Sequence, residues 1–118
     1  MCLGIWKISS SRPVHKRSDR GSREGRCSLR ARSDILSIHS YLAERSLAAA
    51  DRMLVRFSQR FDELRDFPFL GPDRSELRAS LRGLLMDGYI AFYIVEADQI
   101  VIVRVIDGRM DIEQEMSK

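Results

Sequence analysis

Between Leu47 and Leu64 the apolar residues recur at alternating steps of three and four positions. This spacing puts them on one face of a helix about five turns long. Such a helix is marginal alone in water and needs a core to cover its apolar face. The sequence therefore predicts a long amphipathic helix whose inward residues are Leu47, Ala50, Leu54, Phe57, Phe61 and Leu64.

A second apolar stripe precedes this helix, with steps of four, three and four. Its members are Ala31, Ile35, Ile38 and Leu42. Ser28 or Ser33 can cap the start of the helix that it predicts. Only Glu44–Ser46 separates the two stripes, a length typical of two antiparallel helices packed face to face. We therefore expect an N-terminal antiparallel helical hairpin.

After the proline-containing loop Phe67–Pro72 the periodicity changes from helical to that of short strands. Three β-branched or aromatic runs follow, at Leu81–Met86, Tyr89–Val95 and Ile100–Ile106. Asp87-Gly88 is a strong hairpin signal because both residues tolerate positive φ. The expected fold is α+β, with the helical hairpin packed on a three- to four-stranded antiparallel sheet.

The last two runs are apolar on both faces, so a helix can cover one face and a tail or a partner must cover the other. Arg104 interrupts the last run. A buried guanidinium needs either a paired carboxylate or an interface, and the internal candidates are Asp87, Asp107 and Asp111. Tyr89 and Tyr93 share one face of the middle run, where tyrosine serves either an interface or the core.

Positive charge is concentrated at the start of the chain. Residues 1–26 hold seven basic and two acidic residues, a net charge of +5, whereas residues 27–118 carry a net charge of −2. The Ser- and Arg-rich composition of Ser9–Arg26 cannot build a core, so we expect a disordered basic extension at 1–26 and one domain at 27–118. The extension suits a nucleic-acid arm, a targeting peptide or a dispensable tail. The slightly acidic domain is not expected to bind nucleic acid directly.

Signs of catalysis, metal binding and membrane insertion are scarce. Cys2 and Cys27 lack the spacing of a metal or redox motif, and His39 suits the boundary of a helix better than an active site. No apolar run approaches the roughly 18 residues of a membrane span. We expect a cytoplasmic protein without a cofactor or a metal.

Several segments, in this order, resemble the ParE branch of the ParE/RelE toxin superfamily over about Ser28 to Ile112. They include Asp34-Ile35, Tyr41-Leu42, Pro68-Phe69-Leu70-Gly71-Pro72, Gly88-Tyr89 and Ile102-Val103-Arg104-Val105-Ile106-Asp107-Gly108-Arg109. The resemblance implies the toxin half of a bacterial type II toxin–antitoxin pair, held inactive by an antitoxin that wraps around it. ParE-like members are associated with inhibition of DNA gyrase, whereas RelE-like members cleave mRNA on the ribosome.

The two branches differ at their functional positions. RelE-like nucleases have an arginine after the Gly-Tyr of the middle strand, a second one beyond the last strand and a tyrosine in the tail. Here these positions are Ile90, Met110 and Met116, so the groups that would stabilise a phosphorane-like transition state are absent. The resemblance therefore implies a non-enzymatic gyrase inhibitor neutralised by a ParD-like antitoxin. The alternatives are a decayed, non-toxic member, or a ribosome-dependent endoribonuclease that uses Arg82, Arg104 or Arg109.

Partner contacts are expected on the strands and their flanks, at Arg82, Tyr89, Tyr93, Arg104, Asp107 and Arg109. Two segments depart from the family pattern. ParE-like chains usually begin with an alternating apolar strand, but Ser22–Cys27 is almost wholly polar. Either Leu3–Ile8 supplies the first strand across a long loop, or the sheet lacks that edge. The usual His-Gly-Arg-Arg after the final strand is replaced by Asp107-Gly108-Arg109-Met110.

Overall fold

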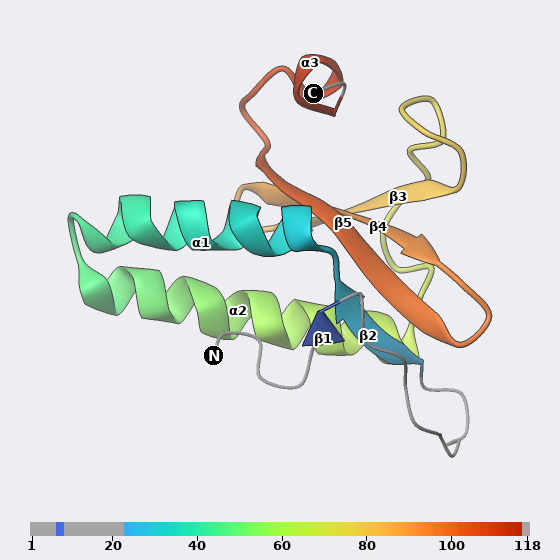
Figure 1. Ribbon diagram of the computed structural model, residues 1–118, viewed down its shortest axis with the longest axis horizontal. Helices are drawn as coiled ribbons and strands as arrows, with labels where there is room; N and C mark the ends of the chain where they lie inside the picture. Colours follow the sequence, from blue (N-terminus) through green and yellow to red (C-terminus); the bar gives the residue numbers. More distant parts are fainter. Residues whose placement is uncertain (1–6, 9–22, 117–118) are drawn as a thin grey trace.

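Two antiparallel helices lie side by side against a five-stranded sheet (Figure 1). The computed structural model describes residues 7–8 and 23–116. The elements are, in chain order, β1 (Lys7–Ile8), β2 (Glu24–Cys27), α1 (Leu29–Ala43), α2 (Leu47–Asp66), β3 (Leu81–Met86), β4 (Tyr89–Val95), β5 (Gln99–Asp107) and α3 (Ile112–Met116). The predicted α+β class and the helical hairpin that leads into the strands are confirmed.

Both helices of the hairpin begin at a serine. The hydroxyl oxygen of Ser28 accepts a hydrogen bond from the Ala31 amide at 3.1 Å, and that of Ser46 accepts one from the Ala49 amide at 3.1 Å. Each bond satisfies an amide that the first turn of a helix leaves without a partner. Of the two caps that the sequence allows for α1, the structure uses Ser28.

The inward stripe predicted for α2 is confirmed over most of its length. Its buried members are Ala50, Phe57, Phe61 and Leu64, and Leu54 packs against the same core while partly exposed. Leu47 is the exception, since it is exposed in the first turn of α2. Figure 1 shows why: this end of the hairpin projects beyond the sheet.

The last three strands form the predicted antiparallel meander. The turn between β3 and β4 has positive φ at both central residues, 53° at Asp87 and 87° at Gly88. Asp-Gly adopts these angles at little cost, which is why the dipeptide predicted the turn. A register shift between Phe92 and Tyr93 interrupts the pairing of β4 with β5.

The strand beside β5 comes from neither alternative that the sequence left open, although part of the Leu3–Ile8 segment does join the sheet. The polar segment Glu24–Cys27 forms β2, which pairs in parallel with β5, and Lys7–Ile8 forms β1, which pairs in parallel with β2. The sheet is therefore mixed, in the order β1-β2-β5-β4-β3. Main-chain hydrogen bonds hold a strand whatever its side chains, so an apolar pattern is not required. The folded unit begins before the expected boundary at Cys27, and most of the expected extension lies outside the described residues.

The second face of the sheet is partly covered by the chain itself. Leu81, Phe92 and Ile106 form a small buried cluster there, and Ile112 and Met116 of α3 pack against it. The guanidinium of Arg74 lies 5.7 Å from the centre of the Phe92 ring. The prediction that both faces of the last strands need cover is thus confirmed, and the tail supplies part of it.

Candidate functional site

A groove of about 440 Å³ runs between α1, the C-terminal half of β5 and α3. Four of the six residues predicted to bind a partner line it, namely Tyr89, Arg104, Asp107 and Arg109. Its other lining residues include Asp34, Ile38, Tyr41, Met110 and Glu115. The groove therefore brings residues of α1 together with residues of β4, β5 and α3, which lie far from α1 in the sequence.

Arg104 is held by a carboxylate that the sequence analysis did not consider. Its Nε donates to Asp34 Oδ2 at 2.8 Å, and its Nη2 donates to Asp34 Oδ1 at 3.3 Å. Only 9% of the Arg104 side chain and 13% of the Asp34 side chain are exposed. The expected partners on the strands and the tail, at Asp87, Asp107 and Asp111, were wrong. Seventy positions separate the true pair, so no local pattern could reveal it.

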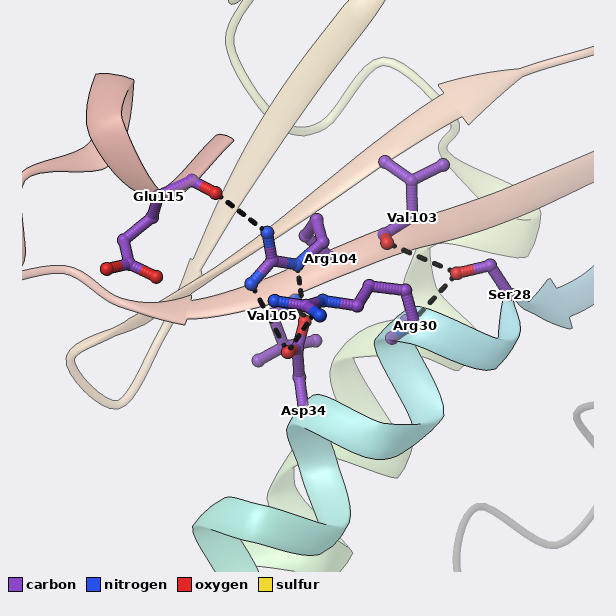
Figure 2. Close-up of polar contacts among 8 residues, drawn as sticks. Ser28, Arg30, Asp34, Val103, Arg104, Val105 and Glu115 are labelled. Carbon is purple, nitrogen blue, oxygen red and sulfur yellow. Dashed lines mark hydrogen bonds and ion pairs between the residues drawn. The ribbon is translucent and has the colours of Figure 1, made fainter. Parts of the chain in front are cut away.

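Asp34 also closes an open edge of the sheet. β2 ends at Cys27, opposite Ile102, so β5 continues past its neighbour. On this bare stretch Asp34 Oδ2 accepts a hydrogen bond from the Val105 amide at 2.9 Å. The Ser28 hydroxyl donates to the Val103 carbonyl at 3.1 Å (Figure 2). The start of α1 thus satisfies main-chain groups that a missing strand would otherwise satisfy.

Asp107 and Arg109 form a second ion pair at the rim of the groove. Arg109 donates to the Asp107 carboxylate through Nη2 at 2.7 Å and Nε at 3.1 Å, and its main-chain amide adds a bond of 2.9 Å. The Arg109 hydrogen bonds lower the pKa of Asp107 to about 2. Conversely, the pKa of Arg109 is raised by the same carboxylate. Because 87% of the Arg109 side chain is exposed, the pair remains within reach of a partner.

Two tyrosine rings contribute to the apolar lining of the groove. Tyr89 packs edge-on against Phe57, with ring centres 5.7 Å apart and an interplanar angle of 75°. Burial raises the pKa of the Tyr89 phenol, so the hydroxyl stays neutral at ordinary pH. Tyr41 is more exposed and carries the Arg45 guanidinium 4.9 Å from its ring centre. An apolar floor with rings and paired charges at its rim suits a protein segment.

Arg82 and Tyr93, the other two predicted residues, do not line the groove. Tyr93 is fully buried; its hydroxyl donates to the Pro68 carbonyl at 2.8 Å and accepts from the Gly71 amide at 2.9 Å. Arg82 Nε donates to the Gly71 carbonyl at 2.7 Å, and its guanidinium stacks on Phe69. The core alternative for Tyr93 is the one that the structure adopts. Both side chains hold the loop before β3.

The three positions that differ from RelE-like nucleases hold apolar side chains in packing contacts or at the rim. Ile90 and Met116 pack against the cluster on the second face of the sheet, and Met110 is exposed beside the groove. Within residues 7–8 and 23–116, no group of His, Cys, Asp and Glu side chains could hold a metal ion. In the same part of the chain, no helix is long and apolar enough to cross a membrane.

Comparison with known proteins identifies the family to which the chain belongs. A family model described as the ParE toxin of the type II toxin–antitoxin system parDE matches residues 26–112. The chain belongs to the ParE toxin family. Toxin ParE3 of Caulobacter vibrioides is 36% identical to it over 69 residues, which are 58% of this chain and 69% of that protein.

A solved structure shares the ParE fold at low sequence identity. It is described as the chromosomal ParDE system from P. aeruginosa, and it superposes with a TM-score of 0.60 over 87% of this chain and 96% of its own. The sequence identity is 14%, so this likeness concerns the fold. The ParE match ends at Ile112, which leaves most of α3 outside the matched segment.

Proposed function

We propose that this ParE-family toxin acts by binding DNA gyrase and that a ParD-like antitoxin neutralises it. The main support is that the arginines needed by the ribonuclease alternative already form hydrogen bonds within the protein. Arg104 donates hydrogen bonds to Asp34, and Arg109 donates to Asp107. Arg82 donates to the Gly71 carbonyl. Each cation would have to leave an internal partner before it could stabilise a phosphate in a transition state. This arrangement favours a protein-binding role over mRNA cleavage.

The three substituted positions support the same proposal. Ile90 and Met116 contribute to packing, and Met110 presents a thioether to the groove. None of these side chains can donate a proton or carry a positive charge. A protein that works by contact needs no such group, so we propose a non-catalytic mode of action.

The surface of α1 suits an antitoxin segment. A shallow depression of about 410 Å³ lies on this helix and shares Ser37 and Tyr41 with the groove. Leu36 and Tyr41 expose large side chains there, and the small serines Ser33 and Ser40 line the same depression. An amphipathic helix can place its apolar face on such a surface, and an extended tail can follow the groove. A cytoplasmic location, as expected from the composition, accompanies this proposal.

The decisive experiment is a DNA supercoiling assay with purified gyrase and antitoxin-free protein. We expect the wild-type chain to inhibit supercoiling and Tyr41→Ala to weaken that inhibition, because Tyr41 supplies exposed aromatic area at the groove. Val55→Ala is the matched control, since Val55 is a comparably exposed apolar residue on α2 that does not line the groove. Folded protein that leaves gyrase activity unchanged would refute the proposal.

The same preparation separates the other two possibilities. Toeprinting of translated mRNA would reveal cleavage on the ribosome, and loss of that cleavage in Arg109→Ala would favour the ribonuclease. Growth arrest after induction without antitoxin would exclude a decayed toxin. An intact toxin of either kind arrests growth, so only the two biochemical assays identify the target.

A further inference from the structure

The two helices that form the walls of the groove, α1 and α3, differ greatly in length and in burial. α1 is a helix of 15 residues that packs against α2 and β5. α3 has only five residues, Ile112–Met116, and none of them is buried. A helix this short has no stability of its own in water. The position of the α3 wall therefore depends on the contacts that attach it to the sheet.

Arg104 attaches α3 directly. Its Nη1 donates to the main-chain carbonyl of Glu115 at 2.9 Å. Another edge of the same guanidinium, with Nε and Nη2, donates to the Asp34 carboxylate. Figure 2 shows the guanidinium between Asp34 on one side and the Glu115 carbonyl on the other. One side chain thus bridges both walls of the groove across β5.

The direction of the Arg104 side chain is fixed by Asp34. The carboxylate accepts hydrogen bonds from two nitrogens of the planar guanidinium. This bidentate geometry points the third nitrogen, Nη1, toward α3. Asp34 is itself held in place by the Val105 amide at 2.9 Å and lies 3.6 Å from Arg30 Nε. The link runs from α1 through Asp34 and Arg104 to α3.

We infer that Asp34 and Arg104 are positioning residues that hold α3 against β5 and so set the shape of the partner-binding groove. The role in partner binding rests on the proposed function. Arg104 then acts on a partner through the placement of α3 and not through its own contact. This accounts for an arginine in a strand where almost every other residue is apolar.

The test compares Arg104→Lys with Arg56→Lys. Lysine keeps the positive charge but lacks the planar fork that reaches Asp34 and Glu115 together. Arg56 is the matched control because it pairs with Asp87 at 2.7 Å in an exposed ion pair that joins α2 to the turn between β3 and β4. In the free protein, we expect the backbone NMR order parameters of residues 112–116 to fall from about 0.85 to below about 0.6 in Arg104→Lys only. Those of α2 stay unchanged in both variants.

Gyrase inhibition provides the functional readout. We expect the half-inhibitory concentration to rise about three- to thirtyfold in Arg104→Lys and to stay at the wild-type value in Arg56→Lys. Ile112→Ala loosens α3 while leaving the ion pair intact, and it should weaken inhibition in the same direction. This second variant tests the inference even if Arg104→Lys fails to fold.

Two outcomes would overturn the inference. One is an α3 that stays ordered in folded Arg104→Lys. The other is an α3 that loosens, in either variant, without any change in gyrase inhibition, because the pair would then serve stability alone. A wild-type protein that does not inhibit gyrase would refute the proposed function, while the order parameters would still decide whether Arg104 positions α3.

Discussion

Two buried polar contacts tie distant segments to the sheet, and they differ in what they leave exposed. At β5, the charged pair of Asp34 and Arg104 lies in the wall of an open groove. At the loop before β3, the neutral hydroxyl of Tyr93 satisfies Pro68 and Gly71 in a closed site. The Tyr93 site is complete within the chain, whereas the Arg104 site adjoins a surface that a partner can occupy.

The closed site leaves no room for a side chain at Gly71. A Cβ on Gly71 would lie 2.7 Å from the Gly83 carbonyl oxygen and 3.0 Å from the Tyr93 ring. The groove, by contrast, leaves about 440 Å³ between its walls. Tyr93 and Arg104 looked alike in the sequence, as polar groups in apolar strands. Their surroundings give both side chains a part in stability, but only Arg104 also adjoins the proposed binding surface.

Replacing Arg104 with alanine should produce the largest loss of stability. It leaves the largely buried Asp34 carboxylate with only the more distant Arg30, 3.6 Å away, as an ionic partner, which costs roughly 3 to 5 kcal/mol in the free energy of unfolding. Urea denaturation measures this loss. The control is Arg56→Ala, which removes an exposed pair and should cost only about 0 to 1 kcal/mol. Equal losses in the two variants would show that burial does not distinguish these pairs.

An intermediate effect is expected for Tyr93→Phe. Removing the hydroxyl leaves the Pro68 carbonyl and the Gly71 amide without their partner, at a cost of about 1 to 3 kcal/mol. Gyrase inhibition at temperatures where the variant is folded should stay at the wild-type level. Tyr89→Phe is the matched control for stability, because the Tyr89 hydroxyl makes no hydrogen bond with the described residues. Weaker gyrase inhibition by folded Tyr93→Phe would contradict the conclusion that the Tyr93 site serves stability and not partner binding.

The smallest expected effect is the change in stability with pH that the ion pair of Asp107 and Arg109 produces. The pKa of Asp107 is about 2 in the folded protein, below the value of about 4 in an unfolded chain. Its ion pair with Arg109 therefore stabilises the folded state above about pH 4, and the contribution is lost as pH falls through about 2. Carbon NMR of the carboxyl group should give this low midpoint in the wild type and a higher one in Arg109→Ala. The midpoint in the variant should remain below the usual value of about 4, because alanine keeps the main-chain hydrogen bond to Asp107. An unchanged midpoint would show that Arg109 is not its cause.

Local patterns were sufficient for most of the fold. The stripe of α2, the Ser28 cap of α1 and the Asp87-Gly88 turn all depend on residues close together in the chain, so they can be predicted from local sequence. β2 escaped prediction because its four residues, Glu24–Cys27, gain their place through main-chain pairing with β5. The short α3 escaped because its contacts come from Arg104 and from the second face of the sheet.

The candidate site was predicted in part. Tyr89, Arg104, Asp107 and Arg109, four of the residues expected to contact a partner, line the groove, and their role in binding stays a prediction. Asp34 was not among the predicted site residues, although the segment that contains it belongs to the resemblance. On a helix it looks like any solvent-facing carboxylate beside the buried Ile35, and only the packing of α1 against β5 gives it a buried role.

The sequence by itself determined the helical hairpin, the antiparallel meander and the membership of the ParE family. These follow from periodicity, turn chemistry and ordered motifs, all of which are properties of short segments. Only the tertiary structure decided the parallel strands, the pairing of Arg104 with Asp34 and the burial of Tyr93. Those features depend on which distant groups meet when the core closes, and a buried charge or hydroxyl is stable only where such a partner arrives.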